Sequence, residues 1–437
     1  MEVHDELVMA KETVAVIGLG FVGLPLSVML AEKGFHVTGI DVDNSKINKI
    51  MNFQSYIGDI DNSRLKKVVN NGWLHPTSNF DEIRAVKNII ICVPTPLTND
   101  KKPDIQFILK AGKEIQKRLQ SGQLIILESS TFPGTTKEIL LPILEESGLK
   151  VGTDFFLANS PERIDPGNSK YSVDEIPKVI GGITNKCKEV AVSFYRKVYK
   201  TVVPVTSAEA AEFTKLLENT FRFVNISFIN EMAILCEQLK IDIWEVIEAA
   251  STKPYGFTPF YPGPGIGGHC IPVDPLYLQW KLKQLDTTSE FISISSQTNE
   301  RIIEHITSRV EKILNPTSLS SAKILIYGVT YKKDVADTRD STAIEVMKQL
   351  RQKGADVQYH DPYVPLLNIA GDIYASKDMT EDLLREMDCV IILTDHAVIP
   401  LEQIVTHARI VFDTKNVTKG LNESSLIVRL GEGSIDL

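Results

Sequence analysis

The chain has 437 residues, of which 43% are hydrophobic and 24% charged, and its formal net charge is −9 at pH 7. This length predicts two or three domains with substantial cores. The acidic balance argues against nucleic acid or an anionic membrane as a partner. The five cysteines form no CxxC pair or other metal-ligand spacing, so we expect no disulfide and no metal. An odd cysteine number without a secretory signal favours a cytoplasmic protein.

A glycine-rich turn stands between a predicted strand and a predicted helix near the N-terminus. β-Branched residues at 14–17 predict the strand, Gly18, Gly20 and Gly23 form a Gly-x-Gly-x-x-Gly turn, and residues 24–33 predict the helix. A second predicted strand, residues 36–40, ends at Asp41. Residues 13–31 carry no charge and are long enough to span a bilayer, but their glycines and proline favour a buried strand–helix unit.

This arrangement is typical of a dinucleotide site. The first glycine makes the tight turn, the second lets the backbone reach a pyrophosphate, and the third lets helix and strand pack closely. The pyrophosphate would lie at the helix N-terminus, where free N–H groups and the helix dipole favour anions. Asp41 would accept hydrogen bonds from the adenine ribose hydroxyls, and its charge would repel a 2′-phosphate. The pattern therefore predicts NAD rather than NADP.

Three further predicted strands, at residues 88–93, 123–128 and 155–158, end in polar loops. In an open parallel sheet the ligand crevice lies beyond the carboxyl ends of the strands, so Thr95 and Thr131 are placed to face it. The alternative for both is ordinary turn or helix-capping chemistry. Glu162, in the third loop, is a candidate acid/base or hydrogen-bonding group. The expected cofactor contacts are Gly18, Gly20, Phe21, Val22, Gly23, Asp41, Pro94, Thr95 and Thr131.

Residues 207–239 contain no proline or glycine and repeat apolar residues at helical spacing, which predicts one long helix. At about 1.5 Å per residue it would extend about 50 Å, more than one small domain can cover. We therefore expect a connecting spine with a homodimer contact. Lys215 and Asn219 lie four residues apart and hence on one face. The alternative for Lys215 is a solvated surface lysine.

The Gly- and Pro-rich segment 262–274 presents one thiol, Cys270, which follows His269 and precedes Asp274 by four residues. Its glycines let backbone N–H groups and a substrate approach closely. The thiolate is the attacking form, and an ordinary thiol needs a base or a local positive field to be used at neutral pH. We interpret this loop as a nucleophile site. The alternative is a tight turn that carries an incidental cysteine.

The last 120 residues or so repeat the opening pattern, with a predicted strand at 322–329 and a predicted helix at 341–353. This second unit lacks the Gly-x-Gly-x-x-Gly turn and carries Lys332, Lys333 and Arg339 instead. Basic side chains in place of glycines suggest a different phosphate-bearing ligand held by side-chain charge. The alternative is a set of solvated ion pairs with neighbouring aspartates.

Taken together, these segments resemble the UDP-glucose/GDP-mannose dehydrogenase family over nearly the whole chain. The motifs that carry the resemblance are the glycine turn with Asp41, Val93-Pro94-Thr95-Pro96, Ser130 to Thr136, Lys215 with Asn219, Gly267-Gly268-His269-Cys270 with Asp274, and Tyr331-Lys332 with Asp337-x-Arg339-x-Ser341. The resemblance implies an NAD-dependent four-electron dehydrogenase that oxidises the C6 alcohol of a nucleotide sugar to the carboxylate.

The same resemblance implies roles for individual residues. Cys270 would be the nucleophile, and Lys215 and Asn219 would stabilise the oxyanion and bind substrate. The implied acid/base and water-positioning groups are Asp274, Thr131 and Glu162. The implied substrate contacts are Glu162, Arg163, Lys215, Asn219, Gly267, Gly268, His269, Lys332 and Arg339.

Two departures from the glucose-type motifs point to one branch of the family. His269 precedes the cysteine and Val273 stands where the UDP-glucose enzymes usually have lysine. The loop at residues 160–168 reads Ser-Pro-Glu-Arg-Ile-Asp-Pro-Gly-Asn, which is similar to UDP-N-acetylglucosamine 6-dehydrogenases. We therefore expect a UDP-N-acetylhexosamine substrate, UDP-N-acetylglucosamine first, in surface polysaccharide biosynthesis. The mannosamine and galactosamine epimers stay open, because a few contacts decide between them.

The predicted fold class is α/β, with two doubly wound Rossmann-like units joined by a central helical segment that contains one long helix. The predicted domains are an NAD-binding domain at residues 1–205, a helical dimerisation and catalytic-loop domain at 206–305, and a UDP-sugar-binding domain at 306–437. A competing hypothesis is an NAD-binding redox sensor whose Cys270 is oxidised. It gives no reason for the second unit or for Lys215, Asn219 and Asp274.

Overall fold

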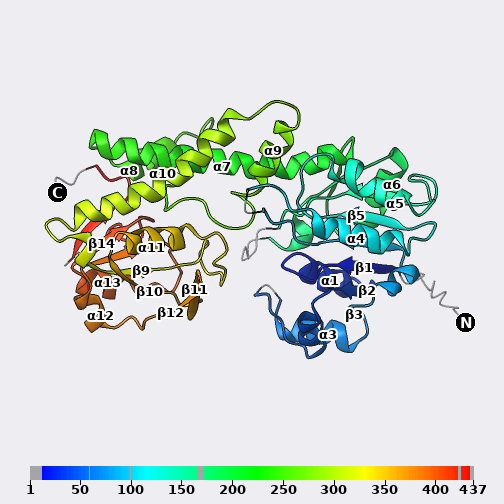
Figure 1. Cartoon of the computed structure of the whole chain (residues 1–437), viewed down its shortest axis with the longest axis horizontal. Coiled ribbons are helices and arrows are strands. Elements are labelled where there is room, and N and C mark those ends of the chain that lie inside the picture. The colour runs from blue at the N-terminus through cyan, green and yellow to red at the C-terminus, as the bar shows by residue number, and fades with distance from the viewer. Residues whose placement is uncertain (1–11, 59, 99, 165–170, 422–424, 434–437) are drawn as a thin grey trace, which may run out of the picture. The chain divides into compact units, whose positions relative to one another are not determined.

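The computed structural model describes residues 12–58, 60–98, 100–164, 171–421 and 425–433. The chain forms two compact units, residues 1–218 with 276–287 and residues 219–275 with 288–437. Each unit contains a largely parallel sheet with helices on both faces, and one long helix runs from the first unit into the second (Figure 1). The predicted fold class is confirmed. Among the described residues, no helix combines the length and the apolar character that crossing a membrane requires.

The first unit carries the predicted strand–turn–helix pattern and continues it. Its elements in chain order are β1 (Thr13–Ile17), α1 (Gly23–Glu32), β2 (His36–Ile40), α2 (Asn44–Met51), α3 (Asn62–Asn70), β3 (Leu74–Thr77), η1 (Phe80–Ala85), β4 (Asn88–Ile91), α4 (Gln106–Gln116), β5 (Leu124–Leu127), η2 (Thr135–Leu140), α5 (Leu141–Glu145), β6 (Phe156–Asn159), η3 (Val173–Glu175), β7 (Lys178–Gly182), α6 (Asn185–Tyr195) and β8 (Val202–Pro204).

The strands of this unit form one sheet with the order β3-β2-β1-β4-β5-β6-β7-β8 over the described residues. All neighbouring strands are parallel except β6 and β7. Successive strand residues point to opposite faces, so Val14 and Val16 pack with α1, α3 and α6, while Ala15 and Ile17 pack with α4 and α5. Burial on both faces explains why the central strands are almost wholly apolar.

The second unit repeats this architecture. Its elements are α8 (Ile243–Ser251), α10 (Glu290–Ile313), η4 (Leu319–Ser321), β9 (Lys323–Tyr327), α11 (Thr342–Gln352), β10 (Asp356–His360), β11 (Leu366–Ile369), β12 (Asp372–Ala375), α12 (Glu381–Glu386), β13 (Cys389–Ile392), α13 (Leu401–His407), β14 (Ile410–Asp413) and β15 (Leu426–Arg429). Helix α9 (Asp274–Lys283) begins in this unit and continues in the first.

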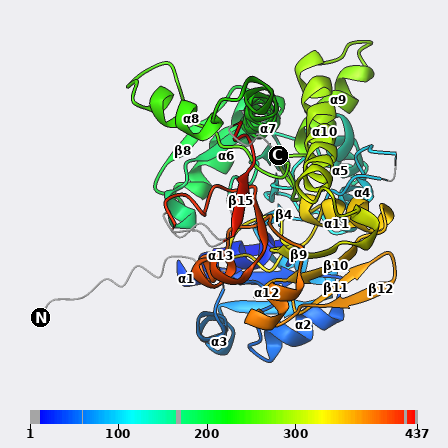
Figure 2. The same ribbon diagram turned by 90° about the vertical axis from the view of Figure 1, so that its left-hand side faces the viewer.

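The described strands of the second unit form a parallel sheet of order β10-β9-β13-β14-β15 and a separate hairpin, β11 with β12. Ile324 and Ile326 of β9 pack with α10 and α11, whereas Leu325 and Tyr327 pack with α12 and α13. Figure 2 shows α11 and α13 on opposite sides of β9. The prediction of a second doubly wound unit is therefore confirmed.

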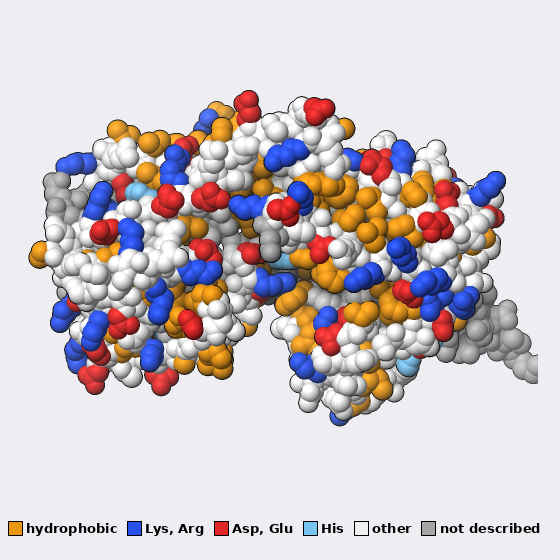
Figure 3. Space-filling view, in the orientation of Figure 1, with side chains coloured by type: hydrophobic (Ala, Val, Ile, Leu, Met, Phe, Trp, Pro, Cys, Tyr) orange, Lys and Arg blue, Asp and Glu red, His pale blue; other side chains and the backbone are white. Residues whose placement is uncertain are grey.

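Helix α7 (Ala208–Leu239) confirms the prediction of one long helix at residues 207–239. Leu216 and Ala233 are buried, but Leu217 and Phe228 are more than half exposed. A helix of this length thus keeps an apolar face that the chain itself does not cover. On the face shown in Figure 3, acidic and basic side chains are interspersed, as expected of a protein with a moderate net charge.

Candidate active site

The glycine turn between β1 and α1 packs tightly against the end of β4. Gly18 has φ +93°, and a Cβ atom on it would lie 2.7 Å from the carbonyl oxygen of Cys92. A Cβ on Gly23 would lie 1.8 Å from the carbonyl oxygen of Gly18. A Cβ on Gly20, by contrast, would meet no atom within 4 Å. The first and third glycines are therefore required by packing, and the second faces open space, as close approach of a ligand requires.

Asp41 lies directly after β2 and is buried. Its Oδ2 accepts hydrogen bonds from the backbone N–H of Leu19 at 2.8 Å and from Lys46 Nζ at 3.1 Å. Its Oδ1 accepts from the backbone N–H of Asp43 at 2.9 Å. The carboxylate thus braces the glycine turn from the neighbouring strand. Phe21, in the turn, is 46% exposed, and Val22 packs against the core of the sheet.

The strand order changes direction between β1 and β4, which is where open α/β sheets bind ligands. Pro94 is exposed and Thr95 buried, and both follow β4 within a few residues. Thr131, four residues after β5, is buried, and its Oγ1 has no hydrogen-bond partner among the described residues. A buried hydroxyl without a partner is costly unless a ligand or water satisfies it. These positions fit a bound dinucleotide.

Helix α7 anchors the loop that contains Thr131. The buried Glu212 accepts hydrogen bonds from the backbone N–H groups of Gly134 at 2.7 Å and Thr136 at 2.8 Å, and from Thr136 Oγ1 at 2.6 Å. One turn later, Lys215 Nζ donates to Ser130 Oγ. Burial raises the pKa of Glu212 to about 7, although these donors oppose the rise. Lys215 is therefore not a solvated surface lysine, because it is half-buried and held against the loop.

Glu162 is buried three residues after β6, in an ion cluster that lies inside the first unit. Lys178 Nζ lies 2.8 Å from Glu162 Oε2 and 2.9 Å from Glu128 Oε2. The hydroxyl of Tyr195 donates to the other oxygen of Glu128. The cluster was not predicted from the sequence, because Glu128 and Lys178 stand at the ends of apolar strands with no local signal of a partner.

Arg163 is held on α7. Its Nε donates to Glu218 Oε2 at 2.9 Å, its Nη2 donates to Glu218 Oε1, and its Nη1 donates to the carbonyl oxygen of Pro177 at 2.7 Å. In this arrangement the guanidinium is committed to a carboxylate, so its predicted role in substrate binding stays a prediction. Residues 165–168 of the same motif lie outside the described residues.

In the second unit, the loop that carries Cys270 is packed on the segment after β9. A Cβ on Gly267 would lie 2.6 Å from the carbonyl oxygen of Asp340, and one on Gly268 would lie 2.6 Å from the ring of Tyr331. Gly268 has φ +89°. Only glycine fits at these two positions, so the loop is held close to the segment that contains Lys332 and Arg339.

Cys270 is exposed, and its carbonyl oxygen accepts hydrogen bonds from Val273 N at 3.1 Å and Asp274 N at 2.9 Å. This turn leads into α9, whose first residue is Asp274. The buried carboxylate of Asp274 accepts a hydrogen bond from Asn219 Nδ2 at 2.6 Å. The second unit therefore brings the predicted residues Asn219, Cys270 and Asp274 together.

Two basic groups lie near this loop. Burial, with a contribution from Arg339, lowers the pKa of His269. Arg339 Nη2 lies 2.6 Å from Asp337 Oδ2, and this hydrogen bond raises the pKa of Arg339 above its ordinary value, with Cys270 among the smaller contributions. Arg339 thus forms an ion pair with a neighbouring aspartate, which the sequence left open as the alternative to ligand binding. Its guanidinium is also within electrostatic reach of the Cys270 thiol. Lys332 is half-buried in the same segment.

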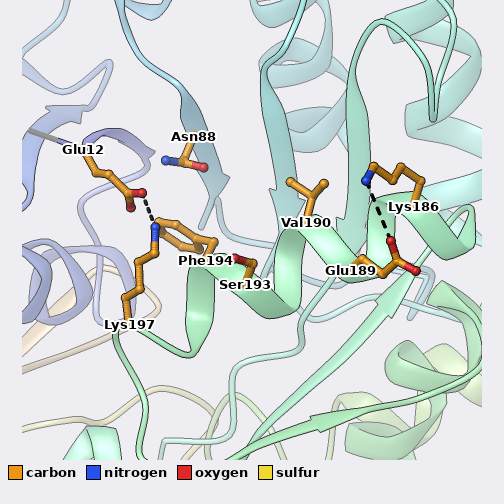
Figure 4. Close-up of a pocket in the computed structure, with 8 residues that line it drawn as sticks. All are labelled: Glu12, Asn88, Lys186, Glu189, Val190, Ser193, Phe194 and Lys197. Atoms are coloured by element: carbon orange, nitrogen blue, oxygen red, sulfur yellow. Dashed lines mark hydrogen bonds and ion pairs between the residues drawn. The ribbon is translucent and has the colours of Figure 1, made fainter. Parts of the chain in front are cut away.

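A separate pocket of about 330 Å³ contains none of the predicted residues. It is lined by side chains of α6 and by Asn88, which begins β4 (Figure 4). Lys197 of this pocket pairs with Glu12, and Lys186 lies 3.8 Å from Glu189. The pocket is at the amino end of β4, whereas ligands of open α/β sheets bind beyond the carboxyl ends.

Sequence models of three domains match this chain. They are the NAD binding domain (residues 12–202), the central domain (residues 209–301) and the UDP binding domain (residues 325–420) of the UDP-glucose/GDP-mannose dehydrogenase family. The chain belongs to this family. The assignment confirms the predicted NAD cofactor and the predicted class, an NAD-dependent UDP-sugar dehydrogenase. The match to a UDP binding domain supports the predicted UDP-sugar ligand.

Individual relatives support the predicted N-acetylhexosamine branch. A UDP-N-acetyl-D-mannosamine dehydrogenase of Methanococcus maripaludis is 34% identical over 430 residues, 95% of each chain. A UDP-N-acetyl-D-glucosamine 6-dehydrogenase of Pseudomonas aeruginosa is 35% identical over 355 residues, 80% of this chain and 83% of that protein. The structure of a UDP-D-ManNAc dehydrogenase from Pyrococcus horikoshii is 32% identical, with a TM-score of 0.88 over 97% of this chain and 100% of that chain.

Substitution of Gly20 by alanine should weaken NAD binding about tenfold or more and leave the unfolding free energy nearly unchanged. The added methyl meets no protein atom within 4 Å, but it would stand where the backbone must approach the pyrophosphate. Gly23→Ala is the matched control, because its methyl collides with the Gly18 carbonyl and should destabilise the fold. Calorimetric NAD titration and urea unfolding measure the two effects. Unchanged NAD affinity in Gly20→Ala would contradict the assigned site.

Proposed function

We propose that this protein oxidises the C6 alcohol of a UDP-N-acetylhexosamine to the carboxylate through a covalent intermediate on Cys270. The observation that carries the proposal is the exposed thiol itself. Of the five cysteines, all within the described residues, Cys270 alone is exposed. Within the second unit, glycine packing holds its loop against the segment after β9, and the cation of Arg339 in that segment is within electrostatic reach of the thiol. Such a partly electropositive, accessible position is typical of a reactive cysteine.

The proposed reaction removes four electrons in two steps. NAD supplies the hydride acceptor for each step. Loss of hydride from C6 and a proton from its hydroxyl gives an aldehyde, and the Cys270 thiolate adds to the aldehyde carbon to form a thiohemiacetal. Loss of a second hydride from that carbon and of the proton on its oxygen leaves a thioester. Water then attacks the thioester carbonyl carbon, releasing the carboxylate, a proton and the free thiol. The covalent intermediate keeps the aldehyde from escaping between the two oxidations.

The remaining predicted residues have chemistry that suits these steps. Lys215 is a positioned cation, and Asn219 has an amide, so both suit stabilisation of an oxyanion. Asp274 and Glu162 are buried carboxylates that could accept a proton or orient water. Thr131 offers a buried hydroxyl that lacks a partner among the described residues. We assign these roles as part of the proposal.

We propose UDP-N-acetylmannosamine as the preferred epimer. The sequence motifs favoured UDP-N-acetylglucosamine, but relatives that cover 95% or more of this chain, from Methanococcus maripaludis and Pyrococcus horikoshii, bear the mannosamine name. The glucosamine enzyme of Pseudomonas aeruginosa, at 35% identity, keeps that epimer as the second candidate. The two sugars differ at C2 alone, so a few contacts decide between them.

We further propose a homodimer through α7. Five of its apolar side chains are 39% to 57% exposed at spacings of four or seven residues, which places them on one face: Phe213, Leu217, Phe221, Phe228 and Leu235. An apolar stripe of this length on a soluble enzyme marks an interaction surface. A second copy of the same helix would cover it by two-fold symmetry.

With NAD and a panel of UDP-sugars, we expect two NADH per sugar oxidised. The acetamido sugars should exceed UDP-glucose in kcat/KM by about tenfold or more. UDP-N-acetylmannosamine should exceed UDP-N-acetylglucosamine. NADH absorbance gives the rates and the end-point stoichiometry. A preference for UDP-glucose would refute the acetamido assignment, and one NADH per sugar with free aldehyde would refute the covalent route.

Cys270→Ser should lower kcat by at least about 100-fold, because a hydroxyl is a poorer nucleophile at neutral pH and forms an ester that hydrolyses slowly. NAD affinity should be unchanged. Cys236→Ser is the control, since that half-buried thiol lies in α7. Equal loss of activity in both variants, with folding intact, would contradict the assignment.

Phe221→Glu should convert the dimer to a monomer at micromolar concentration, because it places a charge in the proposed apolar interface. Arg222→Glu introduces the same side chain at the next exposed position of the helix and should leave the dimer intact. Light scattering reports the mass of each. A wild-type protein with the mass of a monomer would contradict the proposed homodimer. It would leave the proposed UDP-sugar substrate unaffected.

A further inference from the structure

The buried cluster around Lys178 contains more charge than packing alone requires. Lys178, Glu128 and Glu162 are 3%, 1% and 6% exposed, in the interior of the first unit. The rings of Tyr195 and Tyr199 lie 5.5 Å and 5.2 Å from the ammonium. Burying three charged groups costs more than burying apolar side chains of the same size, so such a cluster needs a reason other than stability.

Every oxygen of Glu162 is held by a fixed donor. Its Oε1 accepts from the backbone N–H groups of Arg163 at 2.7 Å and Ile164 at 2.8 Å, and its Oε2 accepts from Lys178 Nζ at 2.8 Å. A carboxylate that accepts three such bonds is stabilised in its ionised form. Glu128 is different, because its Oε1 accepts from the hydroxyl of Tyr195, which can donate or accept.

Charge balance gives the carboxyl groups of Glu128 and Glu162 different protonation states. One ammonium can balance one carboxylate, and burial disfavours the net charge left when both are ionised. Burial raises the pKa of Glu128 to about 7, and the charge of Lys178 offsets this only in part. Burial would also raise the pKa of Glu162, but the charge and hydrogen bond of Lys178 outweigh it and hold that pKa below its ordinary value. A proton therefore goes to Glu128 first.

We propose that Lys178 is a positioning residue that keeps the Glu162 carboxylate ionised and fixed, while Glu128 carries the proton that one ammonium cannot balance. The catalytic meaning of this inference rests on the proposed function, in which Glu162 accepts a proton or orients water. An ionised, immobile carboxylate suits that task and cannot serve as a general acid.

Other titratable groups also face Glu162 and belong to the argument. Lys215 of α7 favours its ionised form, as does Lys178 of β7. From α6, Tyr195 and Tyr199 face the cluster with their pKa values raised well above the ordinary value by burial first. Cys92, after β4, is also buried and has a raised pKa, so it is a neutral thiol. None of the tyrosines or the thiol supplies a positive charge that could replace Lys178.

The pH dependence of kcat/KM for NADH formation tests the inference. In Lys178→Met, Glu162 loses its nearest cation, so its pKa should rise. The acid limb of the kcat/KM profile should therefore move to higher pH by about 1 to 3 units. In Glu128→Gln the acid limb should stay in place, because Glu128 is already protonated, and so uncharged, at the pH where Glu162 titrates. Tyr199→Phe removes a hydroxyl from the same cluster but no charge, and should leave the limb in place. An acid limb that stays in place in Lys178→Met would overturn the inference.

Urea unfolding supplies a readout that needs no activity. In the wild type, the lowered pKa of Glu162 contributes stability above its unfolded pKa of about 4.5, and this contribution is lost as the pH falls. In Lys178→Met the pKa is raised, so stability is lost as the pH rises instead. The gap in unfolding midpoint between the two proteins should therefore widen from about pH 5 to about pH 8.

These two experiments separate the possible failures. A gap in unfolding midpoint that is the same at both pH values would show that Lys178 acts by packing alone and would overturn the inference. If no UDP-sugar yields NADH with the wild-type protein, the proposed function fails. The widening gap would then still decide whether Lys178 keeps Glu162 ionised.

Discussion

The first unit depends on the close approach between the glycine turn and the end of β4. A side chain at Gly18 or Gly23 would collide with backbone atoms, so the turn closes only with glycine at both positions. This closure lets α1 begin at Gly23, with its N-terminus at the carboxyl edge of the sheet. Because parallel strands end at one edge, the loops that carry Thr95, Thr131 and Glu162 follow at the same edge.

At that edge, buried carboxylates fix the loops that carry candidate catalytic groups. Glu212 ties α7 to the loop after β5 by three hydrogen bonds, and Lys215 adds a fourth through Ser130. Lys178 ties the loops after β5 and β6 together through Glu128 and Glu162. The bonds of Glu212 and Lys178 are buried, so they hold their loops more firmly than surface ion pairs would.

The second unit has the same backbone turn after its first strand as the first unit, but the turn carries different side chains. Gly328 after β9 has a positive φ of +82°, and Gly18 after β1 has one of +93°. In the second unit Asp361 accepts a hydrogen bond from the backbone N–H of Val329 at 2.7 Å, and in the first unit Asp41 accepts one from Leu19 at 2.8 Å. Yet the buried His396 also binds Asp361, at 3.1 Å, which leaves that carboxylate inside the protein. Without the second and third glycines, this turn presents basic side chains instead, in accord with the match to a UDP binding domain.

The sequence determined the local features of both units, because periodicity and glycine spacing report which face of a segment is apolar and where the backbone must turn. The strand at residues 36–40, the long helix and the exposed thiol were all predictable in this way. Only the tertiary structure decided which distant charges meet. Lys178 pairs with Glu128 and Glu162, 50 and 16 residues away, and Arg163 pairs with Glu218, 55 residues away. Such partners depend on the order of strands in the sheet and on where α7 packs, which no local pattern records.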